Sequence, residues 1–206
     1  MTGPQTQGIA LLVIDMQEGM AERIRAGRPQ ANPRAEEHTA ALVALFRARG
    51  LPVSHVFHDD AHPESPFRKG LPSAEPMPCA RPAAGEMVLW KHGSSAFHGT
   101  ELEAHLRDRG IGTLVLTGAV AAFCVTSSTR WASDLGFRVI LPGDALIGFD
   151  LPAHDGGRID ADTVLRVTLS LLGADFAPLV STAQVAGLLP QPVGAEETIT
   201  GNFRVF

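Results

Sequence analysis

The chain has 206 residues, 45% of them hydrophobic, with a formal net charge of −5 and a pI near 5.9. This length suits one domain with a sizeable core, and the acidic balance gives no reason to expect nucleic-acid or anionic-membrane binding. Two cysteines argue against a disulfide framework, and the polar start of the chain does not resemble a signal peptide, so we expect a cytoplasmic protein.

Strands and helices are predicted to alternate along the chain. The first strand is the apolar run Ile9 to Ile14, which is far too short to span a bilayer. Further strands are predicted over 51–57, 86–90, 113–117, 137–141 and 177–180, and helices over 34–49, 100–109, 125–135 and 160–172. Repeated β–α units with short connections predict a parallel sheet with helices on both faces.

Three reactive groups follow predicted strands. Asp15 ends the first apolar run, Lys91 follows the strand over 86–90, and Cys124 follows the strand over 113–117. Ligands bind outside the carboxyl ends of strands in open parallel sheets, so these groups predict one shared site. Each residue alone has a simpler interpretation, as a strand-closing acid, a solvated lysine or a buried structural cysteine.

Cys124 precedes the helix predicted over 125–135. A thiol at a helix N-terminus feels unpaired N–H groups and the positive end of the helix dipole, which both favour the nucleophilic thiolate. The same N–H groups can bind an oxyanion that forms on a substrate. This placement therefore favours a nucleophile.

The chain resembles the isochorismatase-like cysteine hydrolases, which include nicotinamidases and N-carbamoylsarcosine amidohydrolase. The matching segments are 11–17 (LLVIDMQ), 91–102 (KHGSSAFHGTEL), 116–125 (LTGAVAAFCV), 132–137 (ASDLGF) and 143–145 (GDA). The resemblance implies a three-layer α/β/α fold with a six-stranded parallel sheet in the order 3-2-1-4-5-6. It also places the family's Asp–Lys–Cys catalytic triad on Asp15, Lys91 and Cys124.

The resemblance implies a cysteine hydrolase that cleaves an amide or ureido C–N bond of a small molecule through a thioester. It further implies a cis peptide between Ala119 and Val120, with the N–H groups of Val120 and Cys124 as the oxyanion hole. An isochorismatase-type vinyl-ether hydrolase and a non-catalytic binding member of the fold are the alternatives. The complete triad argues against both, because neither role requires the thiol.

Five residues are predicted to contact the substrate: Gln17, His58, Phe97, Ala121 and Phe149. Ala121 and Ala122 stand where the family has a hydroxyl residue and often a second polar residue, which makes this part of the pocket more apolar. His55 and His58 suggest a metal, but residues three apart on a strand point to opposite faces. We therefore expect no metal and no cofactor.

Two segments do not follow the alternating pattern. The proline-rich loop over 59–85 follows the second strand and is predicted to be a lid over the site. We assign residues 1–186 to a single domain and residues 187–206 to a tail that contacts a partner subunit. The expected assembly is a homodimer or homotetramer.

Overall fold

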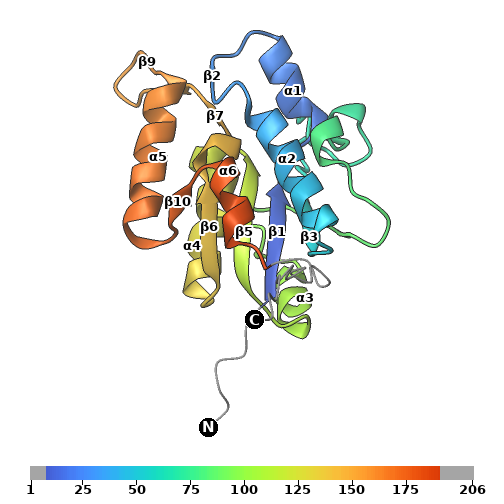
Figure 1. The fold of residues 1–206 in the computed structure, drawn as a ribbon. Helices are drawn as coiled ribbons and strands as arrows, with labels where there is room; N and C mark the ends of the chain where they lie inside the picture. The colour runs from blue at the N-terminus through green and yellow to red at the C-terminus, as the bar shows by residue number, and fades with distance from the viewer. Residues whose placement is uncertain (1–7, 191–206) are drawn as a thin grey trace, which may run out of the picture.

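The fold is built on a mostly parallel sheet, seen in a computed structural model that describes residues 8–190 (Figure 1). Its main strands are β1 (Gly8–Ile14), β3 (Val53–His58), β4 (Met87–Lys91), β5 (Ile111–Ala119), β6 (Arg138–Pro142) and β10 (Leu179–Val180). They lie in the order β10-β6-β5-β1-β3-β4 and pair in parallel. This is the predicted order 3-2-1-4-5-6, so the predicted fold class is confirmed.

Helices cover both faces of this sheet. They are α1 (Glu18–Arg25), α2 (Ala35–Ala48), α3 (Leu102–Asp108), α4 (Thr126–Asp134), α5 (Ala161–Asp175) and α6 (Thr182–Val185). Buried residues of α1, α2 and α6 share one hydrophobic cluster, and those of α3, α4 and α5 share the other. The helices are therefore divided between two cores, which makes three layers.

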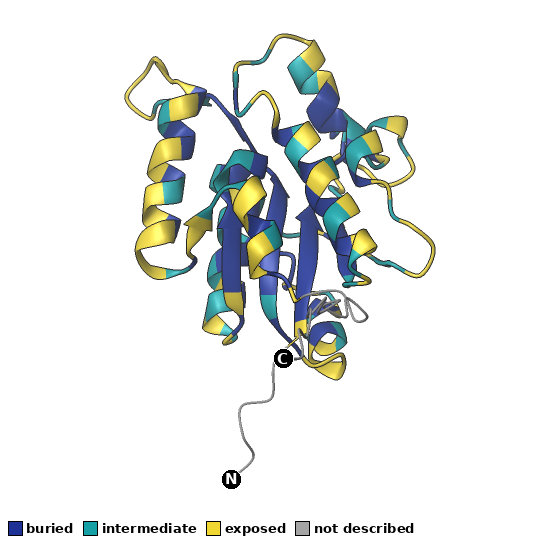
Figure 2. Ribbon diagram, in the orientation of Figure 1, coloured by how far each residue is buried: buried dark blue, intermediate teal, exposed yellow. Residues whose placement is uncertain are grey.

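The central strand β1 explains why two cores form. Leu11 and Val13 belong to the cluster under α2, whereas Ala10, Leu12 and Ile14 belong to the cluster under α3 and α4. Successive side chains of a strand point to opposite faces, so an unbroken apolar run requires a covered face on each side. Figure 2 shows the central strands buried and the helices striped with exposed residues on their outer sides.

Several short elements lie outside the sequence prediction. Strand β7 (Leu146–Phe149) pairs with β5 and with β2 (Gln30–Ala31), and β8 (Leu151–Pro152) pairs with β9 (Arg158–Ile159) in a hairpin. Helix α1 was also not predicted. These elements have at most eight residues, and hydrophobic periodicity is a weak signal over so short a stretch.

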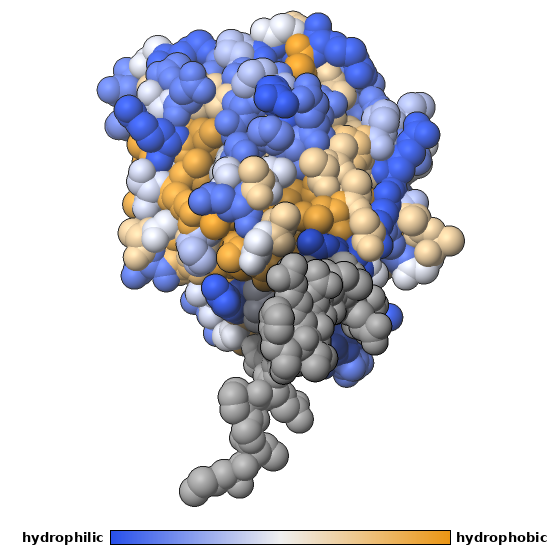
Figure 3. Space-filling model, viewed as in Figure 1, coloured by the Kyte–Doolittle hydropathy of each residue, from blue (hydrophilic) through white to orange (hydrophobic). Residues whose placement is uncertain are grey.

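Two turns of 3-10 helix, η1 (Pro72–Ala74) and η2 (Pro78–Ala80), punctuate the long loop after β3. On the face seen in Figure 3, hydrophobic residues gather around the middle of the molecule, near α6 and β10, and the upper rim is mostly hydrophilic. Within residues 8–190, no helix is long and apolar enough to cross a membrane.

Gly118 of β5 lies very close to the backbone of Ile14 in β1. It pairs with Ile14 and has a φ of +130°, and a Cβ atom at this position would overlap the carbonyl oxygen of Ile14. Only glycine lets the backbones approach this closely with that φ. Because Asp15 follows Ile14, the contact also brings the ends of β1 and β5 together at the edge where the reactive groups lie.

We expect Gly118→Ala to lower the free energy of unfolding by about 3 kcal/mol or more, because it combines a strained φ with a backbone overlap. Gly136→Ala is the matched control, since Gly136 has a φ of +85° but open space around its Cα. That control should cost only about 1 kcal/mol. Denaturant titration compares the two, and equal losses would contradict the close-approach interpretation.

Candidate active site

Adjacent strands bring the three predicted catalytic residues together. Asp15 follows β1, Lys91 is the last residue of β4, and Cys124 lies in the turn after β5. Strand β3 lies between β1 and β4, and its last residue, His58, pairs with Lys91. The carboxyl ends of four neighbouring parallel strands thus supply an acid, two basic groups and a thiol.

Asp15 is held in an unusual conformation at the end of β1. Its φ is +51°, in the left-handed region, and its N–H donates to the carbonyl of Val56 at 2.9 Å. The residue is only 1% exposed. Its Oδ2 atom accepts a hydrogen bond from Lys91, whereas Oδ1 has no partner among the described residues. One carboxylate oxygen is therefore available to accept a proton.

The Lys91 ammonium is the centre of the cluster and is itself only 1% exposed. Nζ donates to Oδ2 of Asp15 at 2.8 Å, to the Gly93 carbonyl at 3.1 Å and to Sγ of Cys124 at 3.3 Å. Nδ1 of His58 lies 3.4 Å away. Burial and the charge of Lys91 lower the pKa of His58, which favours its neutral imidazole. The three N–H groups of the ammonium are used by the other three acceptors.

The Cys124 turn begins at a cis peptide bond between Ala119 and Val120. It continues as one π-helical turn, Ala121–Val125, which leads into α4. The Thr126 hydroxyl donates to the Ala121 carbonyl at 2.7 Å and closes the turn. The helix predicted over 125–135 therefore forms, but the cysteine lies in a π turn before it; π turns occur frequently at functional sites.

Burial opposes the effect that the helix N-terminus was expected to have on Cys124. Burial raises the pKa of Cys124 to about 12, the negative charge of Asp15 acts in the same direction, and Lys91 opposes both. Burying a thiolate beside a carboxylate costs free energy that the helix N-terminus does not offset. Burial and the Asp15 charge therefore both favour the neutral thiol over the thiolate.

Asp15 is placed to act as the base that a neutral Cys124 thiol requires. Burial raises the pKa of Asp15, and the charge of Lys91 opposes the shift. A carboxylate with a raised pKa is a better base, because the proton it accepts is bound more tightly. The pair is therefore suited to passing a proton from Cys124 to Asp15 when a substrate is attacked, rather than to storing a thiolate.

Gln17 has a different role from the predicted substrate contact. Its Oε1 accepts from the N–H of His58 at 2.9 Å, and its Nε2 donates to the carbonyls of His58 at 2.9 Å and Ala74 at 3.0 Å. The residue is fully buried. These bonds use both the oxygen and the nitrogen of the amide. Gln17 therefore holds the end of β3 and the loop over 59–85 in place and is not free to bind a ligand.

One of the predicted apolar pocket residues needs correction. Phe97 is buried, and its ring centroid lies 5.9 Å from that of Phe137, just before the amino end of β6. That end is opposite the reactive edge, so Phe97 is a core residue and the prediction for it is wrong. Phe149 is 2% exposed beneath the Arg28 guanidinium, which lies 4.7 Å from the ring centroid, and Ala121 is 1% exposed. Substrate contact by these two residues stays a prediction.

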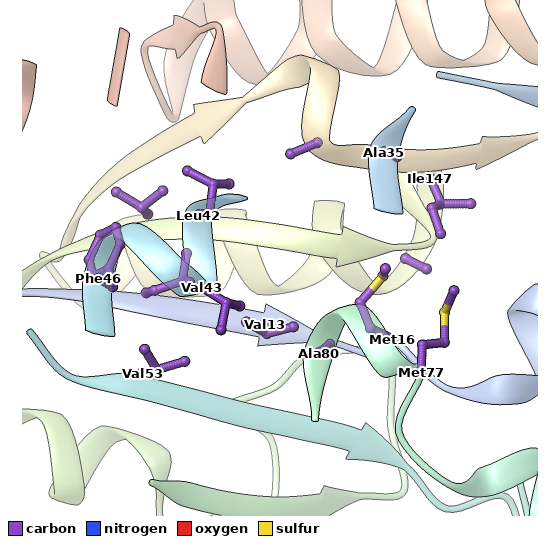
Figure 4. Packing of buried hydrophobic residues seen from close by; sticks show 14 of the residues in the cluster. Val13, Met16, Ala35, Leu42, Val43, Phe46, Val53, Met77, Ala80 and Ile147 are labelled. Atoms are coloured by element: carbon purple, nitrogen blue, oxygen red, sulfur yellow. The ribbon is translucent and has the colours of Figure 1, made fainter. Parts of the chain in front are cut away.

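The loop over 59–85 packs into the protein close to His58. The Phe67 ring lies 6.3 Å from the His58 ring and is covered on one side by the Arg23 guanidinium at 4.8 Å. Met77 and Ala80 join the hydrophobic cluster under α2, and Figure 4 shows Met77 beside Met16. The predicted lid is therefore anchored by core side chains, and whether it opens for substrate stays a prediction.

The two histidines considered for a metal lie on opposite faces of β3, as their spacing predicts. His55 is fully buried, and its Nε2 lies 2.9 Å from Glu86, whereas His58 contacts Lys91. The structure holds no group of three or more His, Cys, Asp or Glu residues placed to bind a metal within residues 8–190.

The sequence does not signal one network of buried ion pairs. Asp150 is 3% exposed and forms ion pairs with Arg28 and Arg158, and the Arg28 guanidinium also donates to the Asp150 carbonyl at 3.0 Å. Arg28 and Asp150 are separated by 122 positions in the sequence. No local pattern signals such a contact, because it depends on the pairing of β2 with β7.

Comparisons with known proteins agree with this architecture. Residues 9–167 match the model of the isochorismatase domain. The isochorismatase family protein YrdC of Bacillus subtilis is 30% identical over 176 residues, which cover 85% of this chain and 93% of YrdC. Maleamate amidohydrolase of Pseudomonas putida is 30% identical over 171 residues, or 75% of this chain and 79% of that protein.

A solved structure is similar over most of the chain. It is a crystal structure of a hydrolase assigned to the isochorismatase family from Chromobacterium violaceum, with a TM-score of 0.83 and 35% identity. The match covers 91% of this chain and 97% of that one.

Opposite electrostatic effects are expected at Cys124. Asp15→Asn removes a negative charge that raises the Cys124 pKa, so alkylation by iodoacetamide should shift to lower pH. Lys91→Met removes a charge that lowers the pKa, so the profile should shift to higher pH. Rates measured by mass spectrometry across neutral and alkaline pH test this, with Cys79 as the internal control. A shift in the same direction for both variants would contradict the assigned electrostatics.

Proposed function

This chain belongs to the isochorismatase family of hydrolases, and we propose that it cleaves an amide or ureido C–N bond of a small molecule with Cys124 as nucleophile. The observation that carries the proposal is the buried Lys91 ammonium, whose Nζ lies 2.8 Å from the Asp15 carboxylate and 3.3 Å from Sγ of Cys124. A thiol next to a base that is itself oriented by a third group is the usual arrangement for nucleophilic catalysis.

The first step forms the covalent intermediate. Sγ of Cys124 attacks the substrate carbonyl carbon as the thiol proton moves to Asp15, and the carbonyl oxygen becomes an oxyanion. The backbone N–H groups of Val120 and Cys124 donate to that oxyanion, and Lys91 stabilises the sulfur while it carries charge. The tetrahedral intermediate collapses as Asp15 returns its proton to the departing nitrogen, which leaves as ammonia and leaves a thioester.

The second step releases the product. Asp15, again a carboxylate, takes a proton from a water molecule that attacks the thioester. The new tetrahedral intermediate expels the Cys124 sulfur, which recovers its proton from Asp15. The net reaction converts an amide and water into a carboxylic acid and ammonia. The hydrolysis of an amide named in the maleamate amidohydrolase relative supports this bond class.

The vinyl-ether alternative uses acid chemistry that needs Asp15 but not a thiol. A non-catalytic binding member needs none of the three groups. The direct contact between Lys91 and Sγ of Cys124 favours the amidase, because it stabilises negative charge on a sulfur atom that neither alternative uses.

We expect Cys124→Ala to abolish ammonia release from a panel of small amides, because no thioester can form. Cys79→Ala is the matched control: it removes the other thiol, whose pKa burial raises to about 12, and should leave turnover near the wild-type value. Ammonia assays and circular dichroism on both variants separate lost chemistry from lost folding. Near-normal amide turnover in Cys124→Ala would refute the proposal.

Asp15→Asn keeps the side-chain shape but removes the base. Turnover should fall about 10²–10⁴-fold, the range typical of general acid–base groups. If Asp15→Asn loses turnover while Cys124 becomes easier to alkylate, Asp15 acts as the base and does not merely support the fold. A variant that retains wild-type turnover would show that another group accepts the thiol proton.

The proposed mechanism supplies the nucleophile, base and oxyanion hole from protein groups. We therefore expect activity to survive exhaustive chelation with EDTA followed by dialysis, with metal content checked by elemental analysis. Inactivation by EDTA that zinc or iron reverses would show that the hydrolysis depends on a metal.

A further inference from the structure

A cavity of about 580 Å³ lies at the amino ends of the central strands, at the end of the sheet opposite the reactive groups. Its lining includes Gly8 and Ile9 of β1, Thr113 of β5 and Arg138 of β6, together with residues 188–190. This volume lies within the range of ligand pockets. The cavity is therefore large enough to receive side chains from a further segment of protein.

The lining of this cavity combines aliphatic side chains with one cation. Ile9, Ile140 and Leu189 are buried members of the cluster under α2, and Leu188 is 45% exposed. Arg138 is exposed, and the arginine ion pairs within residues 8–190 all involve other arginines. The cavity therefore suits a segment that carries apolar side chains and a carboxylate.

The chain itself leads into this cavity. Pro190 is the last described residue and lines the cavity, and its carbonyl accepts a hydrogen bond from the Arg49 guanidinium at 2.8 Å. The preceding residue, Leu189, is 5% exposed. Residues 191–206, most of the tail predicted to contact a partner subunit, lie outside the described residues. That tail therefore starts at the cavity, from a point that core packing and a hydrogen bond hold in place.

The first part of the tail has the composition that the cavity requires. Residues 191–199 read QPVGAEETI, which combines valine and isoleucine with the adjacent acids Glu196 and Glu197. An extended chain advances about 3.3–3.6 Å per residue, so the stretch from Pro190 to Glu196 can span up to about 20 Å. Because Pro190 and Arg138 line the same cavity, the acids are within reach of the arginine.

The segment before β1 does not have this composition. Residues 1–7 precede the cavity-lining Gly8 and read MTGPQTQ, without an acidic side chain. They offer no carboxylate to Arg138. Charge complementarity therefore favours the tail over the segment before β1 as the occupant of the cavity.

We propose that residues 191–199 pack in this cavity of their own chain, with Val193 and Ile199 against its aliphatic lining and the two glutamates beside Arg138. The docked segment covers the amino ends of β1, β5 and β6 and removes aliphatic surface from water. It lies at the opposite end of the sheet from Cys124, so it stabilises the fold without contributing a group to the reaction. The inference is independent of the proposed function.

A glutamate-specific protease tests the docking, because its sites after Glu196 and Glu197 lie inside the proposed docked segment. Mass spectrometry follows the release of residues 198–206 from the 206-residue protein, and a synthetic peptide of residues 191–206 is the undocked reference. Cleavage requires the tail to leave the cavity. The rate then follows the population of undocked tail, so we expect release from the wild-type protein to be at least about tenfold slower than from the peptide.

Two substitutions in the cavity should weaken the docking. Leu188→Asp places a charge in the aliphatic lining and should speed fragment release about fivefold or more. Its matched control is Leu171→Asp on α5, at a residue that is 55% exposed and outside the cavity. Arg138→Asp should speed release about threefold, because an exposed ion pair contributes only modestly. Arg166→Asp is its control of equal charge, and circular dichroism checks that each variant is folded.

A third substitution leaves the folded domain unchanged. Val193→Asp alters only the tail and should speed release from the protein about fivefold, since a charge would have to enter the aliphatic lining. A peptide that carries the same substitution is the control and should be cleaved at the rate of the unchanged peptide.

Release from the wild-type protein at the rate of the peptide would overturn the inference, because the tail would then be undocked. Slow release that none of the three variants speeds would also overturn it, since the tail would then lie elsewhere. Equal effects of the cavity variants and their controls would overturn it by indicating general destabilisation. Protection that disappears on dilution, with a smaller assembly by light scattering, would overturn it by showing that the tail of a second copy fills the cavity.

Discussion

A buried ammonium group is the constraint on which this site depends. Lys91 is 1% exposed, and removing a charge from water costs several kcal/mol unless partners replace its hydration. The Asp15 carboxylate, the Gly93 carbonyl and the Cys124 sulfur accept its hydrogen bonds, with neutral His58 close by. The groups that solvate Lys91 are also those that would react. The contacts that stabilise the buried ion pair therefore also set the geometry of the reaction.

The backbone meets this constraint through the order of its strands. β4, β3, β1 and β5 are neighbours, so their carboxyl ends present Lys91, His58, Asp15 and the Cys124 turn along one edge. The contact of Gly118 with Ile14 sets the separation of β1 and β5 at that edge. Gln17 then ties the end of β3 to the long loop through backbone groups. Together, the strand order, the Gly118 contact and the Gln17 hydrogen bonds fix the positions of the strand ends at this edge.

The turn after β5 places a thiol whose pKa is raised beside the buried ion pair of Lys91 and Asp15. A neutral thiol at rest suits such a site, because charge need develop on sulfur only when a carbonyl group is in place. Proton transfer to Asp15 would then be coupled to attack, and the free protein avoids a standing thiolate beside a carboxylate.

The sequence by itself determined where the main strands run and that Asp15, Lys91 and Cys124 follow three of them, and the order of the strands was implied by the family resemblance. Long apolar runs and helical spacing are local properties, and the motifs carry the family resemblance. Only the tertiary structure decided that Gln17 binds backbone, that Phe97 packs in the core and that Asp150 pairs with Arg28. It also decided that burial raises the pKa of the Cys124 thiol. Those outcomes depend on burial and on partners distant in the chain, and neither is encoded within a short window of residues.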